Sequence, residues 1–411
     1  MKTFSPYIID KLLECRRLTT FYSDQISFGS NKTTVGDIIA IGDIHGDIQL
    51  MLDTLKIGGV IQQINNPHLY AIPIIRKDRK NLIEYYEWIG GNKIVVQVGD
   101  QIDRCRAVHE TKSFCMNENA TYDDEASDIE ILLFFTKLHE QASIAGGAVY
   151  SLLGNHELMN IIGNVSYVSY KNFEQLQIED RGEYVITDEI TKVINEITKV
   201  ITPKSDNNSI NHYMQRRRNI FRSGGILAKF LASTRYSILI VNGYLFVHGG
   251  VLDSFRRHYN KKTQDFDLLN NEIKKFMSND KNSDLNFYKR ILHFIFYTDY
   301  SPFITRDLTK LTKDIEPCTH VETIINHYGL KGIIIGHTPQ IGGINGTCPD
   351  PNHNGKKTLF KIDVASSKAF YIENNIPGKA QVLKINKNDT TEVLQFRNGI
   401  DNTYGIISSN I

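Results

Sequence analysis

Five short apolar runs in this sequence end alike, in a glycine next to a histidine, an aspartate or an asparagine. They occupy residues 37–47 (DIIAIGDIHGD), 93–104 (KIVVQVGDQIDR), 148–157 (AVYSLLGNHE), 244–250 (YLFVHGG) and 332–338 (GIIIGHT). Uninterrupted apolar runs predict strands buried on both faces, and the glycine allows a sharp turn where each strand stops. Open α/β sheets bind ligands beyond the carboxyl ends of their strands, so the five endings predict one shared site.

The five endings are spread over most of the 411 residues. This predicts one elaborated α/β domain spanning residues 1–411 rather than a series of small domains. Helices are expected at 127–142, where Ser127 can cap the first turn and Glu130 completes the capping pattern, and at 269–277 and 284–296. Residues 356–388 alternate in polarity and turn, which predicts strands of a second sheet.

Two stretches, 105–126 and 170–222, are predicted to be insertions. The second contains the near-repeat EITKVINEITKVIT at 189–202, whose apolar positions share one face of a helix. That face is expected to pack on the chain's own core, with binding to a protein partner as the alternative. The triplet RRR at 216–218 is interpreted as a solvated face.

The composition of the chain indicates which partners and which cellular compartment to expect. The chain has 47 basic and 46 acidic residues, so its net charge of +1 gives no reason to expect nucleic acid or an anionic membrane as a partner. No stretch reaches the ~20 apolar residues of a membrane span, and the N-terminus lacks the features of a signal peptide. The five cysteines are few, odd in number and scattered, which favours a reducing, cytoplasmic environment over a disulfide framework.

The polar groups at the strand ends offer nitrogen and oxygen donors without thiolates: Asp43, His45, Asp100, Asp103, Asn155, His156, His248 and His337. Such a set suits manganese, iron or zinc in a reactive site rather than a structural zinc. The donors are too many for one ion, so two divalent cations ~3.5–4 Å apart with a bridging carboxylate are expected. Each group alone has an ordinary alternative, a Gly-Asp turn or a hydrogen-bonded histidine. Their ordered combination favours the metal site.

The motifs GDIHGD, GDQIDR, GNHE, HGG and GHT, in this order, resemble those of the calcineurin-like metallophosphoesterase superfamily and its phosphoprotein phosphatase branch. The chain is most similar to the Shewanella-like protein phosphatases, through WIGGNKIVVQVGDQIDR, GGAVYSLLGNHELMNIIGNVSYV, SGGILAKFLASTRYSILIVNGYLFVHGGV and FKIDVASS. The similarity covers about residues 36–370 apart from the insertions. It implies a four-layer α/β/β/α sandwich, two mixed sheets flanked by helices, with the site at their top.

The resemblance implies that six residues bind two metal ions: Asp43 and His45 the first, Asn155, His248 and His337 the second, and Asp100 both. A hydroxide between the ions would attack phosphorus in line, with no phosphoenzyme intermediate. His156 would protonate the leaving oxygen, and Asp103 would hold it in the right tautomer. Arg104 would hold two phosphate oxygens, and Arg306 or, behind it, Arg222 would be a second phosphate-binding arginine.

Two positions depart from the family pattern. Where the family usually has glycine after its Asp-Arg pair, this chain has Cys105, interpreted as a neutral substitution, with a redox-active thiol as the alternative. Its backbone is expected to avoid positive φ or to tolerate it at some cost. The sequence GHTP at 336–339 lacks a second histidine, which is normal for phosphoprotein phosphatases and argues against the nuclease and cyclic-nucleotide branches.

The resemblance implies a metal-dependent phosphomonoesterase that acts on a phosphoprotein, with manganese as the ion expected in vitro. Hydrolysis of a dinucleoside polyphosphate or another small phosphate ester is the alternative within enzymes. A non-catalytic scaffold that binds a phosphorylated partner is disfavoured, because the expected metal ligands, His156 and Arg104 are all present.

Overall fold

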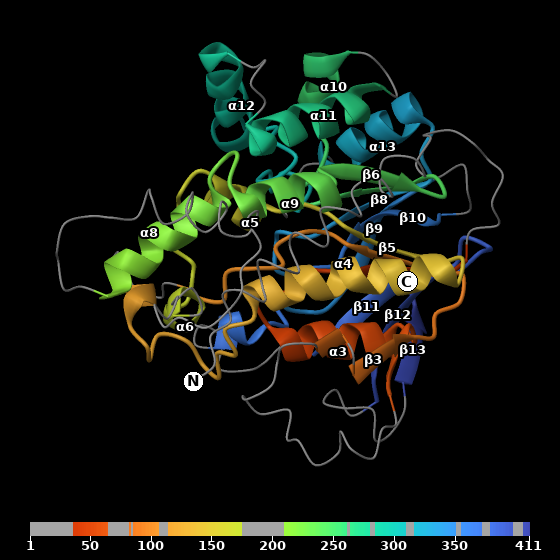
Figure 1. Cartoon of the computed structure of the whole chain (residues 1–411). Coiled ribbons are helices and arrows are strands. Elements are labelled where there is room, and N and C mark those ends of the chain that lie inside the picture. The colour runs from red at the N-terminus through yellow and green to blue at the C-terminus, as the bar shows by residue number, and fades with distance from the viewer. Residues whose placement is uncertain are drawn as a thin grey trace.

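The strands form two large sheets flanked by helices on both outer sides (Figure 1). This is a computed structural model, and it describes residues 36–64, 82–83, 85–106, 114–174, 209–260, 264–279, 284–309, 316–350, 355–371, 379–397 and 406–411. The predicted α/β fold of two mixed sheets between helices is confirmed.

The first sheet has six strands in the order β13-β12-β11-β1-β4-β5. Three parallel neighbours come from the predicted strand runs: β1 (Ile38–Ile41), β4 (Ile94–Gln97) and β5 (Ala148–Ser151). Antiparallel strands extend it on the other side of β1: β11 (Gln381–Ile385), β12 (Thr391–Phe396) and β13 (Ile406–Asn410). The parallel strands end at one edge, which brings their polar endings together.

The second sheet has the order β6-β7-β8-β10-β9. Its strands are β6 (Ile238–Val241), β7 (Tyr244–Val247), β8 (Gly332–Ile335), β9 (Asn345–Pro349) and β10 (Lys357–Lys361). A separate small sheet pairs β2 (Ile61–Gln63) with β3 (Tyr86–Trp88). The expectation that residues 356–388 belong to the second sheet holds only for β10, because β11 crosses back to pair with β1 in the first sheet.

Three separate apolar layers hold the sandwich together. Ile39 of β1 packs with residues of the outer helices α3 and α4, whereas the adjacent Ile38 faces the second sheet. Ile334 of β8 lies in that same central layer, and the adjacent Ile333 packs against the helices of the opposite side. Because side chains alternate along a strand, a strand between two apolar layers must be apolar at every position. This explains the uninterrupted apolar runs.

The helices form the two outer layers (Figure 1). α3 (Ile48–Ile57) and α4 (Asp128–Ile144) cover the first sheet. The second sheet is covered by α9 (Ile226–Thr234), α10 (Asp253–Tyr259), α11 (Gln264–Ser278), α12 (Leu285–Tyr297) and α13 (Glu316–Tyr328). The three predicted helices are confirmed as α4, α11 and α12. Ser127 precedes α4, but its hydroxyl donates to the Gly46 carbonyl instead of capping the helix.

Three further helices and two 3-10 turns complete the described chain. They are α5 (Asn155–Ile161), α6 (Tyr170–Glu174), α8 (Ser209–Phe221), η2 (Phe114–Met116) and η4 (Lys368–Phe370). In the 170–222 stretch, α8 contacts α5, α6 and α9, so this part packs on the chain's own core. The repeat at 189–202 lies outside the described residues. The prediction of a solvated face is wrong for Arg217, which is 1% exposed.

The expectation of free cysteines is wrong for four of the five. Cys105 is bonded to Cys115, and Cys318 of α13 is bonded to Cys348 of β9. Scattered cysteines do not reveal their pairing in the sequence, because pairing depends on which segments the fold brings together. Disulfides persist in oxidising surroundings, so the two bonds weigh against the predicted reducing, cytoplasmic environment.

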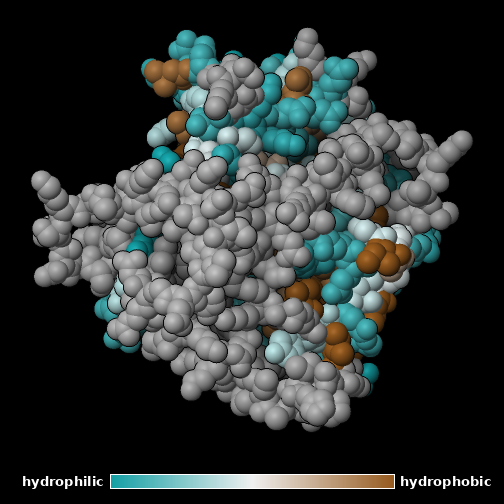
Figure 2. All heavy atoms as spheres, in the orientation of Figure 1, coloured by the Kyte–Doolittle hydropathy of each residue, from teal (hydrophilic) through white to brown (hydrophobic). Residues whose placement is uncertain are grey.

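Exposed hydrophobic residues are scattered over the part of the surface that the structure describes. On the coloured part of the face in Figure 2, hydrophobic side chains occur as separate groups among hydrophilic ones. Large exposed hydrophobic residues such as Ile144 and Tyr297 belong to different helices. None of the helices in the described part of the chain has the length and apolar character needed to cross a bilayer.

The C318S/C348S variant should be less stable than the natural chain, with an unchanged site. The bond spans 30 residues, and its loss should lower the free energy of unfolding by roughly 3 kcal/mol because the unfolded chain regains entropy. Urea unfolding followed by circular dichroism measures the change. An unchanged midpoint would contradict the disulfide.

Candidate active site

The five strand endings meet at one edge of the two sheets, as the sequence predicts. Asp43 and His45 follow β1, and Asp100 follows β4. Asn155 opens α5 after β5, while His248 and His337 follow β7 and β8. Five of these six side chains are buried, and Asn155 is partly buried. The structure therefore brings together all six predicted metal ligands.

Several site residues have a backbone conformation that side-chain-bearing residues rarely adopt. The φ angles of His45, Asp100, Asp103 and His337 are 47°, 52°, 72° and 65°. Each such residue costs roughly 1–3 kcal/mol and persists only where the surrounding structure imposes it, typically at functional sites. Cys105 does not have positive φ, which agrees with the prediction for its backbone.

Two glycines allow the ends of β4 and β5 to approach closely. A Cβ on Gly99, which has φ 102°, would lie 2.5 Å from the backbone nitrogen of Gly154. A Cβ on Gly154 would lie 2.1 Å from Oδ1 of Asp100. The close approach sets Asp100 against the start of α5, where its Oδ1 accepts from the His156 N–H at 2.9 Å. The Glu157 carboxylate accepts from the Asp100 N–H at 3.0 Å and so holds the same turn.

The Asp100 carboxylate lies between two groups of donors. Its Oδ2 is 3.8 Å from both His45 Nε2 and His156 Nε2, and 3.2 Å from His248 Nε2. Two sets of side chains are close enough together to hold a metal ion, His45–Asp100–His156 and Asp100–His248–His337. Asp100 is the member that they share. This placement fits a carboxylate that bridges two cations.

Main-chain carbonyls orient two of the histidines. His248 Nδ1 lies 2.9 Å from the Val98 carbonyl, and His45 Nδ1 lies 3.4 Å from the Ile102 carbonyl. A hydrogen bond at Nδ1 fixes the tautomer and leaves Nε2 available as a metal ligand. His248 Nε2 is also 3.0 Å from Asn155 Oδ1, so these two predicted ligands of the second metal converge.

His337 differs from these two histidines in the ring nitrogen that faces the main chain. Its Nε2 lies 3.0 Å from the Ile304 carbonyl, which leaves Nδ1 as the nitrogen available to a metal. Its backbone N–H donates to both carboxylate oxygens of Asp43, at 3.3 and 3.2 Å. The ends of β8 and β1 are thereby joined across the two sheets.

Acidic groups dominate the electrostatics of the site. Burial, together with the nearby Asp363, holds the pKa of the Asp43 carboxyl well above its usual range. Burial acts to lower the pKa of His248, but Asp100 and Asp43 raise it to about 10. Burial likewise acts to raise the pKa of Asp100, but His248 and His156 hold it well below its usual value. Protonated His248 thus supplies positive charge that bound cations can supply instead.

The remaining groups fit a cation site as well. Burial and then Arg106 lower the pKa of His45 well below its usual value, and burial and then His248 lower that of His337 to about 3. Both imidazoles are neutral, which is the form that binds metals. Asp363 after β10 is a buried carboxylate whose Oδ2 has no hydrogen-bond partner among the described residues. Such an orphaned oxygen next to Asp43 is what a cation would satisfy.

His156 and Asp103 form the predicted acid pair. Nδ1 of His156 donates to Oδ2 of Asp103 at 2.8 Å, and His156 Nε2 faces Asp100. Asn160, one turn further along α5, donates to both Asp103 oxygens at 3.0 Å. The i, i+4 spacing of His156 and Asn160 was the signal in the sequence that could have revealed this contact.

Arg217 is a functional neighbour that the sequence did not reveal. Its Nη2 lies 3.3 Å from Asp103 Oδ1 and 2.8 Å from Asp128 Oδ2, and its Nε donates to Asn160 Oδ1 at 2.7 Å. The guanidinium also packs on the Phe221 ring, 4.7 Å from its centroid. α8 therefore reaches from the 170–222 stretch to the residue that orients His156.

The contacts of Arg104 differ from those expected for the phosphate-binding role predicted for it. Its side chain is fully buried, with Nη1 3.2 Å from Asp47 and Nη2 3.2 Å from Glu125. Nη2 also donates to the carbonyls of Tyr122 and Asp123. Nε and Nη1 make no hydrogen bond among the described residues, but a fully buried guanidinium that already pairs with two carboxylates is poorly placed to reach a phosphate. Arg104 instead ties the first turn after β1 to the 105–126 insertion.

The other two predicted arginines differ in position. Arg306 is exposed, and its charge contributes to the lowered pKa of His337, which places it near the site. Arg222 is exposed at the turn between α8 and α9, where its backbone bonds to Arg218 and Gly225. The described structure shows no contact between Arg222 and a site residue.

Residues 36–340 match the family of calcineurin-like phosphoesterases. The chain belongs to this family. The family and enzyme class that the sequence predicts are thereby confirmed, and divalent metal ions are the family's cofactors.

Known relatives support this assignment. Protein R398 of Acanthamoeba polyphaga mimivirus is 31% identical over 267 residues, 62% of this chain and 94% of that protein. Shewanella-like protein phosphatase 2 of Arabidopsis thaliana is 26% identical over 378 residues, 87% of this chain and 77% of that protein. Among solved structures, the cold-active protein-tyrosine phosphatase of a psychrophilic Shewanella species has a TM-score of 0.53 at 20% identity, covering 92% and 80% of the two chains. This similarity shows a shared fold.

Asp100→Asn should abolish the binding of both metals and turnover together, because Asp100 is the one ligand common to both groups. Metal content per chain, measured by mass spectrometry after dialysis, checks the first effect. Asp389→Asn, which changes a partly buried carboxylate that pairs with Lys331 and lies outside the site, is the control and should keep both metals. Full metal content in D100N would exclude the bridging role.

His156→Ala should keep both metals and lower kcat by roughly 10²–10⁴-fold, since general acid catalysis contributes that much. His156 is within reach of a metal in one of the two donor groups, so metal content is the deciding measurement. Loss of a metal in H156A would make His156 a ligand rather than the acid. His293→Ala removes an exposed imidazole stacked on Tyr297 and should change neither quantity.

Proposed function

We propose that this phosphoesterase is a metal-dependent phosphomonoesterase that acts on phosphoproteins at a two-cation centre. The observation that carries the proposal is the position of Asp100, whose carboxylate is shared by two groups of histidine donors. His156 faces the same carboxylate, so an acid group stands next to the candidate metal positions. This combination favours phosphate-ester cleavage over metal storage or structural metal binding.

Six residues would hold the two cations: Asp43, His45, Asp100, Asn155, His248 and His337. Manganese is the ion we expect in vitro, with iron or zinc as alternatives, because the donors are nitrogen and oxygen only. When bound, the two cations would activate a water as the nucleophile and would supply positive charge for the phosphate oxygens.

The chain's own residues supply the rest of the chemistry. His156 would deliver a proton from Nε2 to the leaving oxygen, because its Nδ1 is held by Asp103 at 2.8 Å. Asp103 is held in turn by Asn160 and Arg217, which keep its carboxylate aimed at the imidazole. Arg306, exposed and near His337, would hold a phosphate oxygen at the entrance.

The identity of the substrate rests on the relatives. The Arabidopsis protein that aligns with 87% of this chain is named a protein phosphatase, which favours a phosphoprotein substrate. The near-neutral net charge of +1 offers no competing reason to expect nucleic acid.

The purified chain with Mn²⁺ should hydrolyse an aryl phosphate and lose that activity to a chelator, with recovery when Mn²⁺ is restored. In a parallel panel, phosphoserine, phosphothreonine or phosphotyrosine peptides should be turned over with higher kcat/KM than dinucleoside polyphosphates. The reverse order would make small phosphate esters the substrates. No hydrolysis with any of manganese, iron or zinc would support the phosphoprotein-binding scaffold instead.

A further inference from the structure

Arg106 lies beside the metal site but has no place in the chemistry described so far. Its side chain is 9% exposed, and its guanidinium lies 4.8 Å from the centre of the Phe370 ring and 5.7 Å from that of Tyr167. Both contacts fall within the range of a cation–π interaction. Two aromatic rings therefore hold this buried charge from two sides.

Those two rings also border the site histidines. The Phe370 ring is 5.5 Å from the ring of His45, and the Tyr167 ring is 4.9 Å from the ring of His156. The rings of His45 and His156 are themselves 4.9 Å apart. Arg106 thus packs on the same two rings that pack on a candidate metal ligand and on the candidate acid, which places it on the side of the site where they meet.

The guanidinium of Arg106 is not neutralised by a partner in the way that Arg104 is. Its Nη1 donates to two main-chain carbonyls, of Asp103 at 3.1 Å and of Cys105 at 2.9 Å. In the described part of the chain, no carboxylate forms an ion pair with it. Asp100, Asp103 and Asp363 act on it from further away. A buried guanidinium that has no carboxylate partner is suited to bind an anionic group of the substrate.

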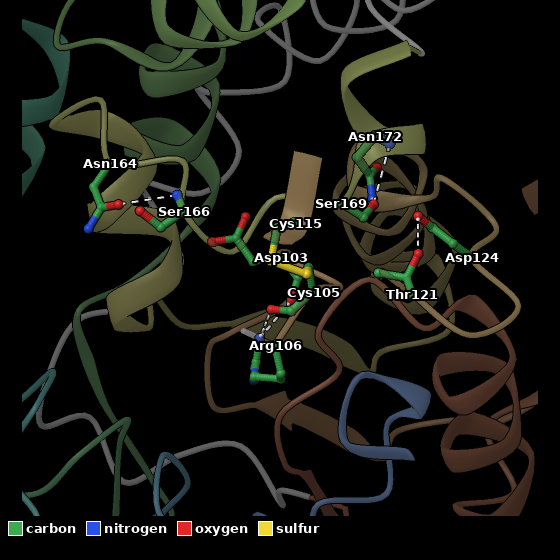
Figure 3. The surroundings of a disulfide bond; sticks show 10 residues. All are labelled: Asp103, Cys105, Arg106, Cys115, Thr121, Asp124, Asn164, Ser166, Ser169 and Asn172. Carbon is green, nitrogen blue, oxygen red and sulfur yellow. Dashed lines mark hydrogen bonds between the residues drawn. A yellow bond between two sulfur atoms is a disulfide. The ribbon is translucent and has the colours of Figure 1, made fainter. Parts of the chain in front are cut away.

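The Cys105–Cys115 disulfide determines where Arg106 can lie. Cys105 is held at three points: its sulfur is bonded to Cys115, its N–H donates to the Tyr167 carbonyl at 3.0 Å, and its own carbonyl accepts from Arg106. Figure 3 shows the disulfide next to Arg106, and both cysteines are buried. Arg106 directly follows this fastened residue in the chain, so the position of Cys105 sets the start of the Arg106 side chain relative to the site.

We propose that Arg106, rather than Arg104, holds the phosphate group of the substrate, and that the Cys105–Cys115 disulfide keeps Arg106 in the site. The proposal rests on the phosphate-ester chemistry proposed above. Arg106 is a substrate-binding residue, and Cys105 and Cys115 are positioning residues that act through it. The cysteine in place of the family's usual glycine is then part of the phosphate-binding apparatus.

Inorganic phosphate, the product of the reaction, is the probe that tests the arginine. Arg106→Met should weaken phosphate binding to the manganese-loaded protein by about 10- to 100-fold, as expected when a charged hydrogen-bond donor is lost, while keeping both metals. Arg106→Lys should recover only part of the affinity, because an ammonium lacks the planar fork. Arg257→Met, which removes an exposed arginine paired with Asp253, is the matched control.

Calorimetric titration with phosphate and the inhibition constant for phosphate in the aryl phosphatase assay report the effect independently. Unchanged phosphate affinity in R106M would overturn the proposal while leaving the phosphatase function intact. If the natural chain turned over no phosphate ester, the proposed function would fail, and phosphate binding by calorimetry would still decide whether Arg106 binds the anion.

The role of the Cys105–Cys115 disulfide is tested by removing it, and removal of the Cys318–Cys348 disulfide is the control. C105S/C115S should weaken phosphate binding in the same direction as R106M and keep both metals, whereas C318S/C348S should lose stability and keep its phosphate affinity. A merely stabilising role for Cys105–Cys115 predicts the opposite, an unchanged phosphate affinity in both variants.

The combination of the two changes separates positioning from general damage. In the R106M background, C105S/C115S should cause no further loss of phosphate affinity, because the disulfide acts only through Arg106. A full additional loss would overturn the positioning role. Should C105S/C115S fail to fold, as judged by metal content and circular dichroism, Cys115→Ala provides a second variant, and the R106M and R106K results decide the arginine by themselves.

Discussion

The rest of the site depends on a buried carboxylate, that of Asp100, held in a strained turn between two groups of histidines. Its backbone has φ 52°, and only the glycines at 99 and 154 leave room for it against the start of α5. Its Oδ1 accepts from the His156 N–H, and its Oδ2 lies close to the imidazoles of His45, His156 and His248. Strain of this kind persists because three apolar layers fix the ends of β1, β4 and β5 at one edge.

The acidic groups gathered at this edge of the sheets favour the binding of cations. Asp43, Asp100 and Asp363 are all buried. Burial and then Asp363 raise the pKa of Asp43; burial acts to lower the pKa of His248, but Asp100 and Asp43 raise it. Buried like charges are costly unless cations or hydrogen bonds compensate them. A pair of divalent ions would do so and would turn the same carboxylates into ligands. The strand ends therefore bring these carboxylates together in an arrangement that bound cations would stabilise.

The sequence predicted the parts of the structure that local pattern controls. Apolar runs followed by glycine predicted β1, β4, β5, β7 and β8 and the candidate donors that lie within a few residues of their ends. The family resemblance then implied which six of these donors would bind metal. The sequence did not predict Arg217 or the two disulfides, since these contacts join segments far apart in the chain. The phosphate-binding role of Arg104 was implied by the family resemblance and not by the residue pattern. The sequence does not distinguish Arg104 from Arg106. The structure does, because Asp47 and Glu125 form ion pairs with Arg104.

Described residues of the 105–126 insertion thus hold both Arg104 and Arg106. At one end, Cys115 holds Cys105 and, through it, the guanidinium of Arg106; further along, Glu125 and the carbonyl of Asp123 hold Arg104. An arginine that is neutralised can brace a turn, and one that is left without a carboxylate can receive an anion. By dividing these two tasks between Arg104 and Arg106, the chain can keep the usual Asp-Arg motif while moving phosphate recognition two residues along. Cys105, which is bonded to Cys115, stands at the position where the family usually has glycine.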